Sequence, residues 1–319
     1  MADNLERDTY GCHIVWIAAR PRPWHAPVAL LAALLYSPAM VPIRQLPTLA
    51  ARRYVQPLRE GGSLPAVVDT DDGLFVVKFR GAGQGAKALV AELIAGMLAD
   101  ELGLPIPKLA LVHVSETFGK SEPDPEIADI LRKSHGINVG LRYLDGAFNF
   151  DMTAAGDMIP ASQATRIVWL DALLTNPDRT ARNTNMLIWE RSPWLIDHGA
   201  ALYAHHDWAA VDEARTRSPF PLIRDHVLLT HAADVGTVDE EMAARLSPDV
   251  IAEVIARVPD SLLEDAAYRA DDDTPDSARA RYASYLTARL TGPRAFAAAA
   301  GKARTERLTD VPVRRTARR

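Results

Sequence analysis

Residues 176–199 read NPDRTARNTNMLIWERSPWLIDHG. A polar loop opens this stretch and holds Asp178 and Asn183, five positions apart. Two short apolar runs follow, separated by a polar turn, and predict a hairpin. Asp197 ends the second run and is followed by His198-Gly199. The stretch therefore predicts two acidic residues and an amide at the ends of one small hairpin, a placement suited to a charged ligand.

The elements around the loop are predicted from periodicity. The hairpin strands are Met186–Trp189 and Trp194–Ile196, with a turn over residues 190–193. Ahead of the loop, apolar residues at helical spacing predict a helix over Ser162–Leu174. Beyond the hairpin, the Ala-rich sequence from Trp208 to Ala300 predicts mainly helices.

The first half of the chain has a strand pattern instead. Runs rich in Val and Phe, bounded by Gly, Pro and Asp, predict strands, and Asp72-Gly73 favours a hairpin turn. One long helix is expected over Ala86–Leu102, because its apolar residues recur at helical spacing and Gly103 follows. A short helix is expected between residues 121 and 135. The predicted strands are Tyr54–Leu58, Leu64–Asp69, Leu74–Phe79, Leu109–Val114 and Ile137–Leu144.

These patterns predict an α+β fold with two lobes. A small β-rich N-lobe is expected over residues 45–145 and a larger, mainly helical C-lobe over 146–300. Residues 1–44 are interpreted as an N-terminal extension, with translation starting at Met1 or at Met40. Residues 301–319 are interpreted as a basic flexible tail. The length of 319 residues suits about two domains.

Five polar residues lie in an order that suits phosphoryl transfer, which is mainly positioning and charge neutralisation. Lys78, on a strand, would hold the phosphates, and Glu92, on the next helix, would orient it. Asp178 would accept the proton of the acceptor hydroxyl. Asn183 and Asp197 would supply oxygen ligands to Mg²⁺. Taken singly, these residues also fit a surface ion pair and ordinary turns; their order and their elements together favour the phosphoryl-transfer interpretation.

Two glycine-containing segments are candidate phosphate loops. Gly81-x-Gly83-x-Gly85 follows a strand and opens a helix, as in a dinucleotide fingerprint. The strand before it carries Lys78 and Arg80, which does not suit the apolar core strand of a parallel sheet. The better candidate is Glu60-Gly61-Gly62-Ser63, and we predict that Gly61, Gly62 and Ser63 contact ATP.

The motifs NPDRTARN and WLIDHG, with VVKF and AELIAGMLADELGLPIP upstream, resemble the HipA-like kinase family over roughly residues 45–260. The resemblance implies a bilobal, protein-kinase-like fold, distantly similar to phosphatidylinositol kinases. It implies that Lys78 contacts ATP, that Glu92 orients Lys78, and that Asp178 is the catalytic base. It also implies that Asn183 and Asp197 bind magnesium, and that a protein seryl hydroxyl is the acceptor, as for the family's best-known member.

The sequence departs from the family pattern at three places. Thr180 stands two positions after Asp178, where the best-known member and the lipid kinases carry His. His198 stands where classical protein kinases carry Phe, and the glycine loop is short. Asn185 is either an additional ligand or the start of the strand. These departures leave the acceptor open, although phosphoryl transfer remains the prediction.

The composition limits the classes of partner that the protein could bind. The formal net charge is −5, which argues against a dedicated nucleic-acid binder. The basic residues of Lys302–Arg319 fit a solvated terminus or docking to an acidic partner. The pair His205-His206 is interpreted as a surface pair, because adjacent side chains point in different directions. The single cysteine, Cys12, excludes an internal disulfide and fits a reducing, cytoplasmic compartment.

An apolar run, Ala26–Ile43, is interrupted by three prolines and is too short to span a bilayer. Acidic residues before it argue against a signal peptide, so no membrane partner is expected.

The sequence thus predicts an ATP- and Mg²⁺-dependent kinase, with a serine or threonine hydroxyl of a protein as first-choice acceptor. A small-molecule or lipid hydroxyl is the alternative within the enzyme class. A non-catalytic nucleotide-binding regulator is the alternative outside it, and a membrane-anchored protein that uses residues 26–43 is a third class.

Overall fold

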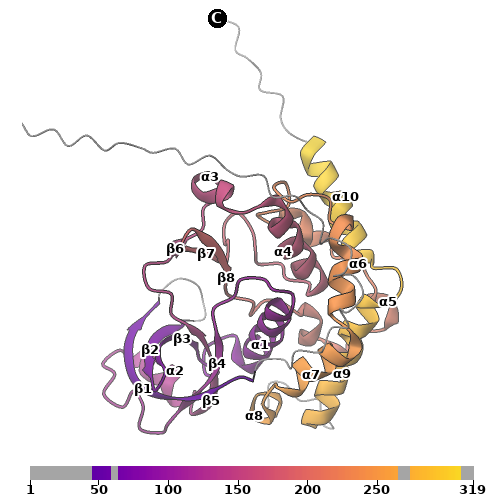
Figure 1. Ribbon diagram of the computed structural model, residues 1–319. Coiled ribbons are helices and arrows are strands. Elements are labelled where there is room, and N and C mark those ends of the chain that lie inside the picture. The colour runs from indigo at the N-terminus through magenta and orange to yellow at the C-terminus, as the bar shows by residue number, and fades with distance from the viewer. Residues whose placement is uncertain (1–44, 59–63, 265–273, 310–319) are drawn as a thin grey trace, which may run out of the picture. The chain divides into compact units, whose positions relative to one another are not determined.

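Five strands close into a barrel in the N-terminal half of the chain (Figure 1). We describe a computed structural model that covers residues 45–58, 64–264 and 274–309. The barrel order is β1-β2-β3-β5-β4, and β4 returns to pair with β1. All pairs are antiparallel except β1 with β4. The strands are β1 (Thr48–Pro57), β2 (Ala66–Thr70), β3 (Gly73–Lys78), β4 (Leu109–Val114) and β5 (Gly136–Arg142).

The barrel is filled by alternate side chains of its strands. Val68, Phe75, Val77 and Val112 are completely buried, as expected where every second residue of a strand points inward. Strand β1 begins six residues before the predicted Tyr54, because Thr48, Leu49 and Ala50 pair with β4. That pairing partner is distant in the sequence, and the local pattern does not reveal it.

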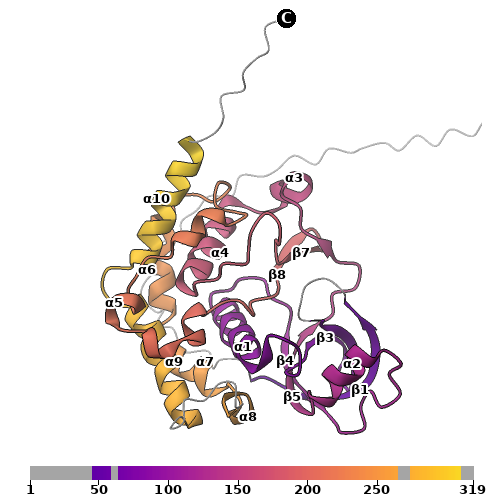
Figure 2. The same ribbon diagram turned by 180° about the vertical axis from the view of Figure 1, so that it is seen from behind.

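Helix α1 (Gly85–Glu101) is buried on nearly every side. It contacts β4 and β5 of the barrel on one side, and α7 (Pro248–Ala256) and α8 (Asp260–Leu263) on the other. Figure 2 shows α1 between the strands and these helices. Gly96 permits the close approach, since a Cβ there would lie 2.8 Å from atoms of Ile106 and Leu109. Burial all round explains why α1 is almost uniformly apolar.

The C-terminal half is mainly helical and carries a second, three-stranded sheet. The sheet order is β6-β7-β8, from Phe148–Asn149, Met186–Trp189 and Ser192–Leu195. Thus the chain mixes helices and strands, as the sequence predicts. The remaining helices are α2 (Pro125–Arg132), α3 (Met152–Ala155), α4 (Ala161–Leu173), α5 (Glu213–Thr216), α6 (Gly236–Arg245), α9 (Pro275–Leu290) and α10 (Ala295–Thr309).

Short 3₁₀ turns at Gly156–Met158, Tyr203–His206, Trp208–Ala210 and Pro221–Asp225 connect these helices.

Three local predictions are corrected. The hairpin turn is only Glu190-Arg191, because Ser192 and Pro193 already pair within β8. Residues 301–309 are not a flexible tail: they continue α10, where Ala303 is buried and Arg304 donates to the carbonyl of Ala232. His205 is not on the surface. It is completely buried, and its Nδ1 lies 3.0 Å from the Tyr282 hydroxyl.

The described part of the chain contains no helix that is long and apolar enough to cross a membrane. The predicted extension over residues 1–44 and the segment 310–319 lie outside the described residues.

Candidate active site

Lys78 ends strand β3 and brings two distant carboxylates together. Its Nζ lies 2.6 Å from Oε2 of Glu92, on α1, and 2.5 Å from Oδ1 of Asp197, which follows β8. Lys78 is 7% exposed and Glu92 is completely buried. Three of the five residues singled out in the sequence therefore meet at one point, between the barrel, α1 and the small sheet.

The charges at this point stabilise one another. Burial by itself would lower the pKa of Lys78, but Glu92 and Asp197 outweigh it and raise that pKa above its usual value. Burial would likewise raise the pKa of Glu92, but Lys78 and His198 hold it well below its usual range. Lys78 is thus a cation and Glu92 an anion at neutral pH.

The segment after β8 is held against α1. The backbone N–H of His198 donates to Oε2 of Glu92 at 2.7 Å, and its ring Nδ1 lies 3.4 Å from Oε1. Gly199 packs close to α1, since a Cβ there would lie 3.4 Å from the Cβ of Ala88. Asp197 has a φ of +54°, a strained conformation that Asp tolerates better than most residues. These contacts fix the direction in which the Asp197 carboxylate points.

A second group forms in the loop before β7. Oδ2 of Asp178 accepts hydrogen bonds from the amides of Asn183, at 2.8 Å, and Asn185, at 3.1 Å. Asn185 has a φ of +47° and precedes β7 without being part of it. The structure therefore places Asn185 beside Asp178, with its amide directed at the carboxylate.

The loop connects the two groups. The backbone N–H of Ile196 donates to the carbonyl of Asn185 at 3.0 Å. The same carbonyl accepts from Nη1 of Arg179, which is almost completely buried. Residues just before Asp197 and just after Asp178 thus share one acceptor, which joins the two groups through the backbone of the loop.

The loop is supported by a buried cluster that the sequence interpretation missed. Asp171, in the last turn of α4, pairs with Nε of Arg179 at 2.6 Å and lies 2.9 Å from Nε2 of His226. Burial would raise the pKa of Asp171, but Arg179 and His226 hold it well below its usual range. The available signal was an acidic residue inside the apolar run Leu170–Leu174, where a carboxylate needs a buried partner.

The predicted ATP-loop residues Gly61, Gly62 and Ser63 lie outside the described residues. The rival glycine segment is packed against protein at its start, because a Cβ on Gly81 would lie 2.6 Å from Cβ of Lys133 and 2.7 Å from the carbonyl oxygen of Ile130. This close packing explains the glycine at position 81.

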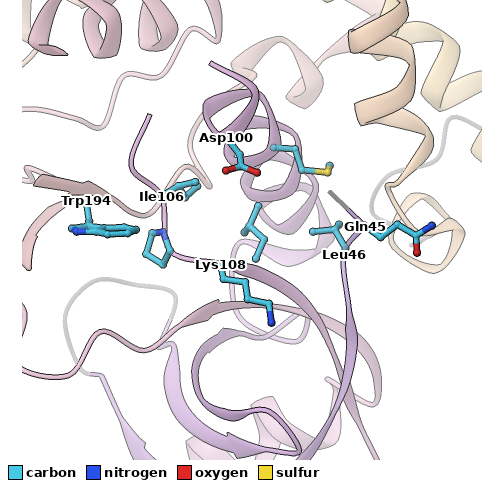
Figure 3. A pocket seen from close by; sticks show the side chains of 9 residues that line it. Gln45, Leu46, Asp100, Ile106, Lys108 and Trp194 are labelled. Carbon is cyan, nitrogen blue, oxygen red and sulfur yellow. The ribbon is translucent and has the colours of Figure 1, made fainter. Parts of the chain in front are cut away.

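A cavity of about 210 Å³ lies near the C-terminal end of α1, between residues of that helix, the segment that follows it and β8 (Figure 3). Its lining includes Met97, Asp100, Lys108 and Trp194, and none of the five polar residues singled out in the sequence. Among the residues that the structure describes, no cluster of three or more His, Cys, Asp or Glu side chains is placed to hold a metal ion.

A comparison with models of protein families identifies one family. A family model described as HipA-like kinase matches residues 54–272, a range that contains Lys78, Glu92 and the whole stretch 176–199. No curated protein matches the chain. The crystal structure of a Helicobacter pylori proinflammatory kinase, CtkA, is 13% identical, with a TM-score of 0.45. That match covers 82% of this chain and 99% of that chain.

Proposed function

The chain belongs to the HipA-like kinase family, and from this premise we propose that it transfers the γ-phosphoryl group of ATP to a hydroxyl group. In this proposal the barrel with α1 is the N-lobe of a bilobal, protein-kinase-like fold, and the part after residue 145 is the C-lobe. ATP would bind between the two.

One observation carries the proposal. A buried lysine on a barrel strand contacts both a helix carboxylate 14 positions away and a loop carboxylate 119 positions away. The two carboxylates exceed the charge of the one lysine, and this excess of negative charge suits a divalent cation that would carry the phosphates of ATP. When ATP binds, its phosphates would replace part of the Asp197 contact with Lys78.

The other residues have defined roles in this proposal. Lys78 neutralises charge on the phosphates, and Glu92 keeps Lys78 in place. Asp178 accepts the hydrogen bond of the attacking hydroxyl and takes its proton as the new P–O bond forms and the bond to the ADP oxygen breaks. Asn183 and Asn185 orient the Asp178 carboxylate.

The oxygen atoms of Asn183 and Asp197 suit a magnesium ion as ligands. The amide nitrogen of Asn183 is bonded to Asp178, which leaves its amide oxygen available as a hard ligand, and the Asp197 carboxylate is another. Mg²⁺ takes few protein oxygens and completes its shell with phosphates and water. Asn183 and Asp197 would hold the ion, and the ion would neutralise phosphate charge.

The family resemblance favours a serine or threonine hydroxyl of a protein as acceptor. A small-molecule or lipid hydroxyl remains the second candidate. Retention of Lys78, Glu92, Asp178, Asn183 and Asp197 favours an enzyme over a non-catalytic nucleotide-binding regulator.

The test is ATP binding and turnover on the purified full chain. Binding is followed as a thermal shift with ATP and Mg²⁺, and transfer as autophosphorylation and ATP hydrolysis. Asp178→Ala and Asp197→Ala are the site variants. Asp72→Ala, which removes an exposed carboxylate paired with Lys108, is the control.

We expect activity in the wild type and in Asp72→Ala, and its loss in both site variants. Magnesium-dependent ATP binding without transfer would favour the regulator. A folded protein that binds no ATP would refute the proposal.

A further inference from the structure

Asp171 is surrounded by donors. It is 1% exposed, in the last turn of α4. Its Oδ1 accepts from the side-chain amide of Asn176 at 2.8 Å, and its Oδ2 accepts from Nε of Arg179 at 2.6 Å. His226 reaches the same Oδ2 through Nε2 at 2.9 Å. A carboxylate with three donors inside the protein is fixed in orientation.

The tautomer of His226 follows from its neighbours. Its Nδ1 accepts from the backbone N–H of Leu228 at 3.1 Å. Burial lowers the pKa of His226, and Arg179 lowers it further, although Asp171 opposes both. The neutral ring therefore carries its proton on Nε2 and donates it to Asp171.

Two routes lead from Asp171 to Asp178. On the first, Asn176 donates to Asp171 while its Oδ1 accepts from the backbone N–H of Asp178 at 3.1 Å. On the second, Arg179 donates to Asp171 and to the carbonyl of Asn185, whose side chain donates to Asp178. The backbone of Asp178 is thus held by a group that Asp171 holds directly, and its carboxylate by Asn185, which Asp171 reaches through Arg179.

The group around Lys78 depends on Asp171 less directly. Lys78 is held by the side chains of Glu92 and Asp197, and Glu92 by His198; Arg179 reaches this group at the backbone carbonyl of Ile196, at 3.5 Å. Loss of Asp171 would consequently move Asp178, which faces the acceptor hydroxyl, more than Lys78, which faces the phosphates. This separation gives Asp171 a kinetic signature that general destabilisation would not share.

We propose that Asp171 is the positioning residue of the catalytic loop, acting through Asn176 and Arg179 to orient Asp178. The inference rests on the proposed phosphoryl transfer. Misplacement of a reacting group by about 1 Å costs on the order of 100-fold in rate. The Asp171→Asn variant is therefore expected to lose roughly 10- to 100-fold in kcat, with KM for ATP changed less than about threefold.

The chain offers a matched control. Asp239, on α6, accepts from Nε1 of Trp169 on α4 at 2.7 Å and from Nε of Arg294 at 2.8 Å. Like Asp171, Asp239 is a carboxylate that accepts hydrogen bonds from one ring N–H and one arginine. It packs against α4, and both of these partners lie outside the loop that carries Asp178. Asp239→Asn is expected to keep both kinetic constants.

The second variant is Asn176→Ala, which cuts the first route and leaves the Asp171–Arg179 ion pair intact. It is expected to lower kcat, as Asp171→Asn does. It replaces Asp171→Asn as the test if that variant does not fold. A folded Asp171→Asn or Asn176→Ala with wild-type kcat overturns the inference. So does a loss that appears only as a raised KM for ATP.

Amide hydrogen exchange separates this inference from the proposed function. The Asp178 N–H is bonded to Asn176 in the wild type, and we expect its exchange to be at least tenfold faster in Asp171→Asn than in Asp239→Asn. If the wild type transfers no phosphate, the proposed function fails, and the exchange rates alone decide the inference. Equal rates in the two variants overturn it.

Discussion

Nζ of Lys78 lies 2.5 Å from Oδ1 of Asp197, although 119 positions separate the two residues. The contact joins the last residue of a barrel strand to the segment after the β7–β8 hairpin. In the proposed function, Asp197 binds magnesium and Lys78 binds phosphate. In this structure, the Asp197 carboxylate therefore occupies part of the phosphate position at Lys78. The Lys78 ammonium group likewise occupies part of the magnesium position at Asp197.

Replacing Lys78 by Met is expected to reduce both stability and activity. The substitution leaves Glu92 completely buried without its cation. Removing one partner of a buried pair costs about 3–5 kcal/mol, measured here as the free energy of urea unfolding. Phosphoryl transfer should fall to background.

The control for Lys78 is Lys108→Met. Lys108 forms an ion pair with Asp72 in which both side chains are about half exposed, and exposed pairs contribute about 1 kcal/mol or less. Equal losses of stability in the two variants would contradict the buried-pair argument.

Asp197→Asn is expected to remove the magnesium dependence of ATP binding. The thermal shift that ATP produces in the wild type should require Mg²⁺ and disappear with EDTA. In the variant, the shift should be small and equal in both conditions, because an amide is a weaker ligand for a hard cation. Asp178→Asn should retain the wild-type dependence, and a retained dependence in Asp197→Asn would remove Asp197 from the metal site.

The stability of the fold should decrease in mild acid because of His205. Burial lowers the pKa of this residue to about 3, whereas an unfolded histidine titrates near 6.5. The unfolded chain therefore binds the proton more tightly. The stabilisation that the neutral His205 provides is complete above pH 6.5 and is lost as the pH falls toward 3. The loss in the free energy of unfolding reaches about 2 kcal/mol at pH 5.

Urea unfolding at pH 7 and pH 5 tests this expectation. His205→Asn, which keeps an amide near the Tyr282 hydroxyl, should show a smaller difference between the two pH values than the wild type. His113→Asn replaces an exposed histidine on β4 and should keep the wild-type difference. The same difference in all three proteins would exclude His205 as the source.

The β7–β8 turn offers a stabilising change. Glu190 and Arg191 have φ values of +50° and +61°, and two positive φ values are typical of a turn that prefers Asn-Gly. Combining Glu190→Asn with Arg191→Gly should raise the free energy of unfolding by about 1 kcal/mol. The pair Glu190→Ala and Arg191→Ala removes the same charges and should give no gain. An equal gain from both pairs would show that charge, not backbone conformation, is responsible.

Local pattern was sufficient for most elements. The predicted helix Ala86–Leu102 differs from α1 by one residue at each end, and the predicted strand Leu109–Val114 coincides with β4. Periodicity and turn residues are properties of neighbours in the chain, so the sequence carries them directly. Lys78, Glu92 and Asp197 were also predicted from the sequence, because their order along the chain and the elements that carry them suit phosphoryl transfer.

Tertiary structure decided everything that depends on distant partners. Closure of the barrel required β1 to pair with β4, and burial of His205 required Tyr282 on α9. The cluster around Asp171 required His226, 55 positions away. The sequence by itself determined which side chains are present and which local elements carry them. Only packing decided which buried charges meet, because a charge leaves water only where its partner is already in place.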